Sequence, residues 1–308
     1  MAWRGLHLTR PSRLSLAQSQ VRIEQEEGEV RLAVEDIAWI VIDTPQATIT
    51  SALLSTLAER GVAVILTDAA HTPSGVFLPF HGHHRQGEIA RMQIALSGPL
   101  CKRLWRTIVR AKIANQAAAL AAVGRGDAAP LSAMADRVRS GDPDNVEARA
   151  ARAYWAAFWP AFRREDDGDR RNMLLNYGYA VVRAAVARGL VASGLLPAFG
   201  VHHASATNAF NLADDLVEPF RPFVDVLAWR TAGNGAPDRA PLTREDRQTM
   251  AGALLSPAIM GREAVTLLVA TEMAAAALVR AMEGRTPAAL LLPALPGPAD
   301  RSAPPIAR

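Results

Sequence analysis

Short apolar patterns typical of strands run through the first 80 residues. Val21 and Ile23 alternate with polar residues, and so do Val30, Leu32 and Val34. This two-residue period predicts strands with one buried face. The Glu-Glu-Gly-Glu stretch between the two patterns is polar and contains a glycine, so we expect the two strands to form a hairpin.

Continuous apolar runs at 37–42 and 62–66 indicate two strands that are covered on both faces. Between them, residues 50–60 carry leucines at helical spacing, and Gly61 follows as a helix stop. The sequence therefore predicts a small β-rich domain with one helix over residues 1–80.

The pattern changes after this domain. Residues 71–87 are dense in glycine, proline and histidine, which is typical of a linker. Beyond them the chain is rich in alanine and has helical texture. Thr243 with Asp246, and Ser256 with Pro257, have the residue types of helix starts. Helices are predicted at residues 88–96, 99–123, 145–164, 172–193, 213–230, 243–253 and 257–283.

These patterns predict an α+β chain in which a small N-terminal β-rich domain precedes a larger all-α helical domain. The expected boundaries are 1–80 for the first domain, 81–90 for the linker and 91–284 for the helical domain. Residues 285–308 are rich in proline, and we expect them to be disordered or extended along a partner.

Composition favours a cytoplasmic protein. With Cys101 as the only cysteine, neither an intrachain disulfide nor a cysteine zinc cluster can form. The N-terminus lacks the apolar stretch of a signal peptide. Two apolar segments, 173–192 and 264–279, approach the length of a membrane helix. Arginines interrupt the first and Glu272 the second, so we interpret both as buried helices and expect no membrane association.

The kind of basic residue says more about partners than the net charge of +4 does. Among 34 basic residues only Lys102 and Lys112 are lysines. The arginine fork suits phosphate binding, although a GC-rich genome explains the bias equally well. The first half of the helix predicted at 99–123 carries four basic residues. They are compatible with a DNA-binding face and equally with an ordinary solvated face: Lys102, Arg103, Arg106 and Arg110.

Glu147 lies where a carboxylate is unexpected. It precedes Ala150, Tyr154 and Phe158 at helical spacing and so shares the face that these residues turn inward. A carboxylate that points into a core is costly unless it is paired, protonated or bound to a metal ion. The alternative is a helix-start acid that satisfies backbone amides, with Asp144 as the N-cap.

A second cluster contains His202 and His203, a polar loop, and then Asp214, Asp215 and Glu218. Imidazole with carboxylates is a ligand set for a divalent cation, and hard oxygen ligands favour Mg²⁺ or Mn²⁺. Because Pro219 disfavours a helical residue before it, Glu218 can be helical only if both residues lie in a first turn or at a kink. The alternative is a set of helix-start acids beside a core histidine.

A third group, His81, His83 and His84, lies in the expected linker with no acid adjacent. We interpret it as an exposed or DNA-facing loop rather than a metal site.

Taken together, four motifs resemble the CRISPR-associated integrase of spacer acquisition, most of all the version found in type II systems. They are Glu147-Ala-Arg-Ala-Ala-Arg-Ala-Tyr-Trp155, Asn172-Met-Leu-Leu-Asn-Tyr-Gly-Tyr179, Gly200-Val-His-His203 and Asp215-Leu-Val-Glu-Pro-Phe-Arg-Pro222. The spacing of 15 in residue number from His203 to Glu218 also matches the family pattern. Ala148 departs from it, because the family usually has glycine there.

The resemblance implies that Glu147, His203 and Glu218 bind the metal ion and carry catalysis, with Asp215 as a further ligand or as support for the site. It assigns no metal role to His202. It implies strand transfer of a captured DNA fragment into a CRISPR repeat, with Mg²⁺ or Mn²⁺. It further implies a homodimer assembled partly through the β-rich domains, and a heterohexamer in which a small ferredoxin-like adaptation partner bridges two dimers.

Three other functions are compatible with parts of the pattern. One is a stand-alone structure-selective nuclease that acts on branched DNA in repair. Another is an architectural DNA scaffold in which the acids only cap helices. The third, a helical-bundle metal oxidoreductase, needs a second carboxylate and histidine pair that the sequence does not offer.

Overall fold

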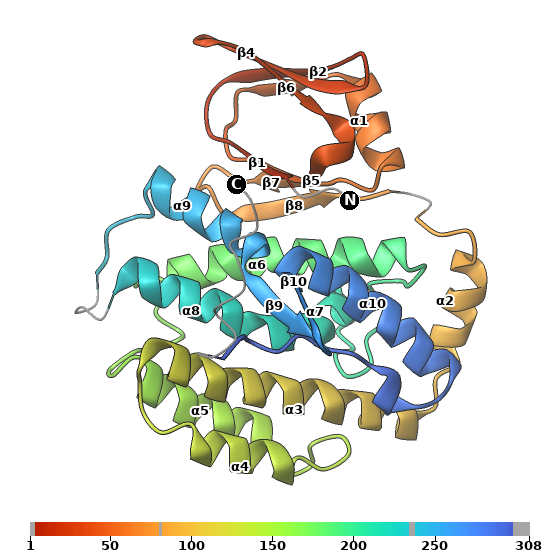
Figure 1. Ribbon diagram of the computed structural model, residues 1–308, viewed down its shortest axis with the longest axis vertical. Helices are drawn as coiled ribbons and strands as arrows, with labels where there is room; N and C mark the ends of the chain where they lie inside the picture. Colours follow the sequence, from red (N-terminus) through yellow and green to blue (C-terminus); the bar gives the residue numbers. More distant parts are fainter. Residues whose placement is uncertain (1–3, 80–81, 234–237, 298–308) are drawn as a thin grey trace. The chain divides into compact units, whose positions relative to one another are not determined.

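Two four-stranded sheets form in the first part of the chain, and helices dominate the rest (Figure 1). The computed structural model describes residues 4–79, 82–233 and 238–297. Contacts between Cα atoms divide the chain into two units, residues 1–84 and 85–308. His81 and the end of the proline-rich segment, from residue 298, lie outside the described residues.

The first unit is the β-rich part that the sequence predicted. Its elements are β1 (Arg4–Leu8), β2 (Ser12–Ala17), β3 (Gln20–Gln25), β4 (Gly28–Ala33), η1 (Val34–Asp36), β5 (Ile37–Ile42), β6 (Ala47–Ile49), α1 (Ser51–Glu59), β7 (Ala63–Thr67) and β8 (Pro73–Phe77). One sheet has the order β1-β5-β7-β8, with its first three strands parallel. The other has the order β4-β3-β2-β6.

The hydrophobic pattern explains the core of this unit. Every residue of β5 is buried, as its unbroken apolar run predicted. Strands β3 and β4 form the expected hairpin, in which Val21 pairs with Leu32. Helix α1 begins after Thr50, whose hydroxyl accepts from the Leu53 amide, and it buries Leu53 and Leu57 in the core.

The expected linker contains regular structure. Residues 71–87 include β8, which pairs with β7 at the edge of its sheet, where Pro73 at the strand start removes no interior hydrogen bond. Helix α2 (Gln86–Ile94) begins inside the linker range 81–90 and buries Ile89 and Gln93. Glycine and proline in this segment therefore mark turns around a strand rather than a long connection.

In its described residues, the second unit is helical apart from one hairpin. Besides α2 its elements are α3 (Gly98–Val123), α4 (Ala129–Arg137), α5 (Val146–Phe158), α6 (Arg170–Ala192), α7 (Asn211–Val217), η2 (Glu218–Phe220), α8 (Arg221–Ala232), α9 (Arg244–Ala251), η3 (Gly252–Leu255), β9 (Pro257–Met260), β10 (Glu263–Thr266), α10 (Leu267–Glu283) and η4 (Pro287–Ala289). The prediction of an all-α domain is therefore wrong in this detail.

The error lies in the helix expected at 257–283. Residues 257–266 form the antiparallel pair β9–β10, which turns at Gly261 with a φ of 66°. Helix α10 begins only after Thr266, whose hydroxyl accepts from the Val269 amide. Pro257 starts a strand here, not a helix. The helix start expected at Thr243 with Asp246 is confirmed, and the two residues form a capping box in which each side chain accepts from the other's backbone amide.

Helix α6 is the centre of the second unit. It packs against α7, α8, α9 and α10, while α3 packs against α4, α5, α8 and η2 (Figure 1). Most of its side chains are buried, which explains its nearly continuous apolar sequence. Its two interrupting arginines form ion pairs, Arg183 with Asp214 and Arg188 with Glu272. Among the described residues no helix combines the length and apolarity needed to cross a membrane.

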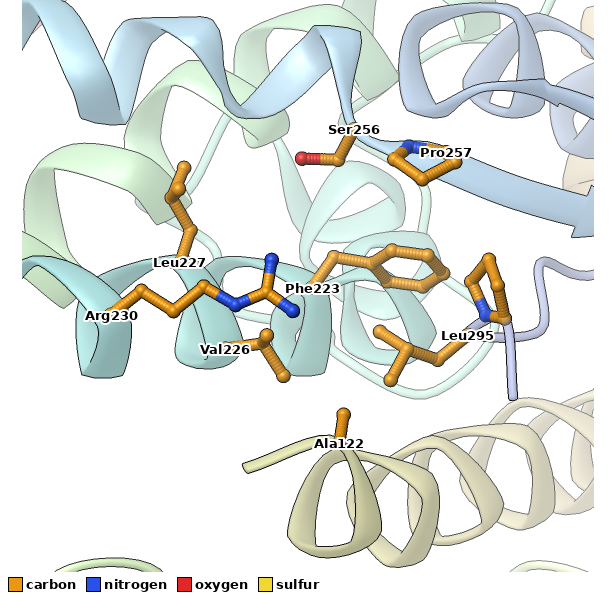
Figure 2. Close-up of a pocket in the computed structure, with 9 residues that line it drawn as sticks. Ala122, Phe223, Val226, Leu227, Arg230, Ser256, Pro257 and Leu295 are labelled. Carbon is orange, nitrogen blue, oxygen red and sulfur yellow. The ribbon is translucent and has the colours of Figure 1, made fainter. Parts of the chain in front are cut away.

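The described part of the proline-rich segment, up to Gly297, packs against the helical unit, where disorder was one expectation. Ile259 and Ala294 form a β-bridge. Leu295 lines a pocket with Phe223 of α8, and Figure 2 shows their side chains facing the same space. Apolar side chains therefore attach a segment whose proline content alone indicated no fixed structure.

Candidate metal centre

Glu147 stands in the first turn of α5, and its carboxylate is not used as a helix cap. Asp142 takes that part, because its carboxylate accepts from the backbone amides of Val146 and Glu147, each at 2.9 Å. Asp144, the N-cap in the alternative reading, instead binds Arg139. The Glu147 carboxylate therefore remains free for another partner.

Glu218 begins a short 3₁₀ turn in front of Pro219. Helix α7 ends at Val217, the turn η2 follows, and α8 starts at Arg221. Glu218 keeps helical backbone angles, with φ −54° and ψ −45°, and is buried in the helical unit. Its Oε1 accepts from Nε of Arg221 at 2.8 Å, so one carboxylate oxygen is fixed from its own segment.

A lysine joins the two carboxylates. Nζ of Lys112, on α3, lies 2.6 Å from Oε1 of Glu147 and 2.5 Å from Oε2 of Glu218. Burial would lower the pKa of Lys112, but Glu218 and Glu147 outweigh it and raise this pKa. Burial pushes the pKa of Glu218 upward, but Lys112 and Arg221 bring it down to about 2. Lys112 and Glu218 are therefore both charged near neutral pH.

His203 is held from behind by a buried carboxylate. Oδ1 of Asp215 lies 2.7 Å from Nδ1 of His203 and also accepts from the His203 amide. Oδ2 of Asp215 accepts from the amides of Val201 and His202. The hydrogen bond with Asp215 raises the pKa of His203. With Nδ1 held in this way, the imidazole keeps Nε2 for another ligand.

The loop before His203 depends on Gly200. A Cβ at this position would lie 2.3 Å from the His203 carbonyl oxygen and 2.7 Å from Oδ2 of Asp215. Both contacts are impossibly short, so only glycine allows the loop to close around Asp215. The glycine of the predicted Gly-x-x-His motif therefore has a steric reason.

His202 lies beside the cluster without joining it. Its ring stacks on Trp105 of α3, with centroids 4.1 Å apart and planes within 2°. The same indole meets the His203 ring edge-on, at 5.8 Å. Trp105 thus supports both imidazoles, and the stacking gives His202 a role other than metal ligation.

A buried acid behind the carboxylate pair is shared by two tyrosines. Tyr154 of α5 and Tyr179 of α6 both donate to the Asp225 carboxylate. Burial raises the pKa of Asp225 to about 7, against the lowering effect of the two hydroxyls. The guanidinium of Arg221 lies over the Tyr179 ring, 4.6 Å from its centroid, which connects this network to Glu218.

The side chains of Glu147, Glu218 and His203 suit a divalent cation as ligands, although the ammonium of Lys112 lies between the two carboxylates. Two carboxylates already bind one small cation, and a histidine backed by a carboxylate is a common metal ligand. In the part of the chain that is described, no three His, Cys, Asp or Glu side chains stand ready to hold an ion together. The structure therefore brings the carboxylates of Glu147 and Glu218 to the ammonium of Lys112, while the His203 ring pairs with Asp215.

Two residues of the predicted basic face of α3 already have partners within the protein. Nε of Arg106 donates to the Val138 carbonyl, and Nη2 of Arg110 binds Asp136 of α4. Lys102 and Arg103 are exposed. Of the third histidine group, His83 stacks on His84, with centroids 4.5 Å apart.

Sequence reasoning assigned no role to Lys112, Arg221 or Asn115. One signal for Lys112 was present. In a chain where all but two of 34 basic residues are arginine, a lysine inside a helix marks a place for a point charge. Asn115 carries no such signal, because its partners lie far away in sequence. Its amide donates to the carbonyls of Pro219 and Pro293, and its Oδ1 accepts from the Leu295 amide.

Comparisons with known proteins agree on one family. The family model "CRISPR associated protein Cas1" matches residues 6–258. The chain is 44% identical over 227 residues to the CRISPR-associated endonuclease Cas1 of Neisseria meningitidis serogroup C, covering 73% of this chain and 75% of that protein.

Solved structures show the same fold. A casposase bound to its integration product aligns with a TM-score of 0.74 and 18% identity, over 92% of both chains. A chain of the Cas6-RT-Cas1–Cas2 complex aligns with a TM-score of 0.70 and 16% identity, over 93% of this chain and 36% of that one.

Proposed function

The chain belongs to the Cas1 family of CRISPR-associated proteins, and from this premise we propose that it is a metal-dependent DNA endonuclease and integrase. Its reaction is the joining of captured DNA fragments into a CRISPR array by strand transfer. The resemblance found in the motifs around Glu147, His203 and Glu218 is thus confirmed at the level of the family.

The observation that carries the proposal is the convergence of Glu147 and Glu218 on one cation. The two residues come from α5 and η2, far apart in the chain, and no packing requirement explains why two carboxylates should meet there. Because both pair with the same Nζ, at 2.6 and 2.5 Å, Oε1 of Glu147 and Oε2 of Glu218 are at most about 5 Å apart. Two oxygens on one ion with ligand bonds of about 2.0–2.3 Å lie at most about 4.6 Å apart, so the two carboxylates need to approach each other by no more than about half an ångström to share it.

Each residue has a defined part in this proposal. Glu147 and Glu218 bind the ion through those two oxygens, and His203 contributes Nε2. Asp215 is a positioning residue rather than a ligand, because its oxygens already accept four hydrogen bonds from the 201–203 loop. Mg²⁺ or Mn²⁺ fits a site with two carboxylates and one imidazole.

The reaction is an in-line displacement at phosphorus. When bound, the metal ion polarises the scissile phosphate and lowers the pKa of the attacking hydroxyl. In the neutral ring of His203, Asp215 favours the proton on Nδ1, which leaves Nε2 as the nitrogen for ligation. Tyr154 and Tyr179 are not nucleophiles, because burial raises the pKa of both hydroxyls and both donate to Asp225. A 3′ hydroxyl as the attacking group gives a joined strand, and water gives a nick.

The proposal extends to the assembly in the cytoplasm. DNA is the substrate, and the chain acts as a homodimer. A small ferredoxin-like partner bridges two dimers into a heterohexamer. Two structural neighbours support the DNA substrate and the partner protein alone: one is a casposase bound to its integration product, and the other is a Cas6-RT-Cas1–Cas2 complex.

The test is a strand-joining assay with a supercoiled plasmid that carries the repeat and a labelled fragment with free 3′ hydroxyls. With Mn²⁺ or Mg²⁺ and the partner protein, the wild type should transfer the label to the plasmid. Glu147→Gln, His203→Ala and Glu218→Gln should each abolish transfer. Glu245→Gln, which alters an exposed acid in the first turn of α9, is the matched control and should retain it.

Two results would overturn the proposal. Transfer of the label at the wild-type rate by any of the three variants would remove that residue from the site. Metal-dependent cleavage of branched DNA without any joined product would favour the stand-alone nuclease instead.

A further inference from the structure

Lys112 occupies the position between Glu147 and Glu218 that the proposed metal ion would take. Its ammonium touches both carboxylates, at 2.6 and 2.5 Å. The side chain is largely buried, with 13% of its surface exposed. Lysine is a compact point charge on a flexible stem, and in this respect it resembles a metal ion more than arginine does.

The two carboxylates need a positive charge even without metal. Two carboxylates that share a site repel each other, and one then takes up a proton unless a cation lies between them. Arg221 cannot supply that charge alone, because it binds only Oε1 of Glu218. Oε2 of Glu218 and Oε1 of Glu147 face Lys112 instead.

We propose that Lys112 is a positioning residue that substitutes for the metal ion. Its ammonium holds Glu147 and Glu218 in place in the metal-free protein and leaves them when the ion binds. The inference rests on the metal site proposed above and goes beyond it, because it makes metal binding an exchange of one cation for another.

The surroundings of Lys112 suit such an exchange. Arg221 binds Oε1 of Glu218 and lies over the Tyr179 ring, so Glu218 remains fixed after Lys112 departs. Asp142 holds the amide of Glu147 and fixes the start of α5 in the same way. The backbone of the site therefore stays in place while the flexible lysine side chain moves.

The test measures metal binding without DNA. Mn²⁺ is titrated calorimetrically into the wild type and into Lys112→Met, which keeps the length of the side chain but removes its charge. Since the variant has no competing ammonium, its affinity for Mn²⁺ should rise on the order of tenfold. Its melting temperature in a chelator should fall below that of the wild type, and Mn²⁺ should restore it. Lys102→Met removes the only other lysine, an exposed one on the same helix, and should change neither quantity.

The outcomes separate this inference from the proposed function. If the wild type binds no Mn²⁺, the metal site itself is wrong, and the inference is lost with it. If the wild type binds Mn²⁺ but Lys112→Met binds it equally or more weakly, the exchange is wrong and the metal site stands. If Lys112→Met is unfolded in the chelator, Mn²⁺ must refold it, and a variant that stays unfolded with Mn²⁺ contradicts the exchange.

Discussion

The carboxylate of Asp215 accepts a hydrogen bond from the backbone amide of His203 and pairs with Nδ1 of the His203 ring. These two contacts fix the histidine at its main chain and at its side chain. The carboxylate is fully buried, while 45% of the His203 side chain is exposed. Asp215 therefore holds the 201–203 loop from inside the core and orients the half-exposed ring of His203.

Asp215→Asn should weaken metal binding by about 10- to 100-fold, the usual effect of losing a carboxylate behind a metal-bound histidine. The new amide NH₂ would also face backbone N–H groups that now donate to Oδ2. Calorimetric titration with Mn²⁺ measures the effect. Asp214→Asn is the matched control, because Asp214 pairs with Arg183 and should affect binding much less. Equal losses in the two variants would contradict the assigned role of Asp215.

The same substitution should change how His203 titrates. The bond with Asp215 raises the pKa of His203, so the charged pair stabilises the fold below about pH 6.5. That contribution is lost as the pH rises through the raised value. In the metal-free protein, an NMR titration of the His203 ring should therefore show a lower pKa in Asp215→Asn than in the wild type. An unchanged pKa would mean that Asp215 does not hold the ring in solution.

Asn115→Ala should destabilise the protein by about 2–4 kcal/mol, because it leaves buried partners without hydrogen bonds. The lost bonds connect α3 to Pro219, beside Glu218, and to Pro293 and Leu295 in the C-terminal segment. Urea unfolding measures the loss. Gln116→Ala removes a neighbouring buried amide whose Oε1 accepts no hydrogen bond within the described structure, and it should cost less. The reverse order would show that Asn115 does not link these segments.

Asp225 should make stability depend on pH. Its pKa in the fold is raised to about 7, mainly by burial. The folded protein therefore keeps a proton that the unfolded chain releases near pH 4. The contribution of Asp225 to stability should fall by about 1 kcal/mol per pH unit between pH 5 and 7 and level off above pH 7. Glu218 acts in the opposite direction and only at lower pH, because its pKa is lowered to about 2.

The measurement is urea unfolding of the metal-free protein at pH 5, 6, 7 and 8. Asp225→Asn keeps the shape of the side chain without the titration. Its stability should vary less with pH than that of the wild type over pH 5–7. Parallel curves would show that Asp225 does not take up the proton.

The sequence predicted elements wherever a local pattern determines them. The alternation at Val21 and Ile23, the apolar run 37–42 and the helix start at Thr243 each lie within a few residues, and each prediction is confirmed. The prediction failed at Pro257, where a helix start and the first residue of a strand look alike. The hairpin there is decided by Gly261 and by the pairing of Ile259 with Ala264, which a local pattern does not contain.

The site was harder to predict than the fold because its contacts are long-range. The motifs singled out Glu147, His203 and Glu218, but nothing in their spacing shows that Lys112 lies between the two glutamates. The choice between Asp142 and Asp144 as the cap of α5 was also out of reach. Both acids precede the helix, and only the turn of the chain places Asp142 under its amides. Burial and ion pairing across helices decide these roles.

DNA binding should depend on Arg103 more than on Arg110, although both lie on the predicted basic face of α3. The Arg110 guanidinium already pairs with Asp136, 2.8 Å away, and this carboxylate compensates its charge, so it should attract a phosphate less strongly. Arg103 is exposed. Each phosphate contact releases counterions, so losing one lowers the slope of log affinity against log salt by about 1.

Fluorescence anisotropy with a labelled duplex, over roughly 50–200 mM salt, measures that slope. Arg103→Ala should lower both the affinity for DNA and the slope of log affinity against log salt. The exposed guanidinium of Arg103 can neutralise a phosphate, and the counterions released from that phosphate contribute to the slope. Arg110→Ala should leave the slope near the wild-type value and instead loosen α4, which a lower melting temperature would report. If Arg110→Ala lowers the slope as much as Arg103→Ala does, the pair with Asp136 opens when DNA binds, and the whole basic face belongs to the DNA surface.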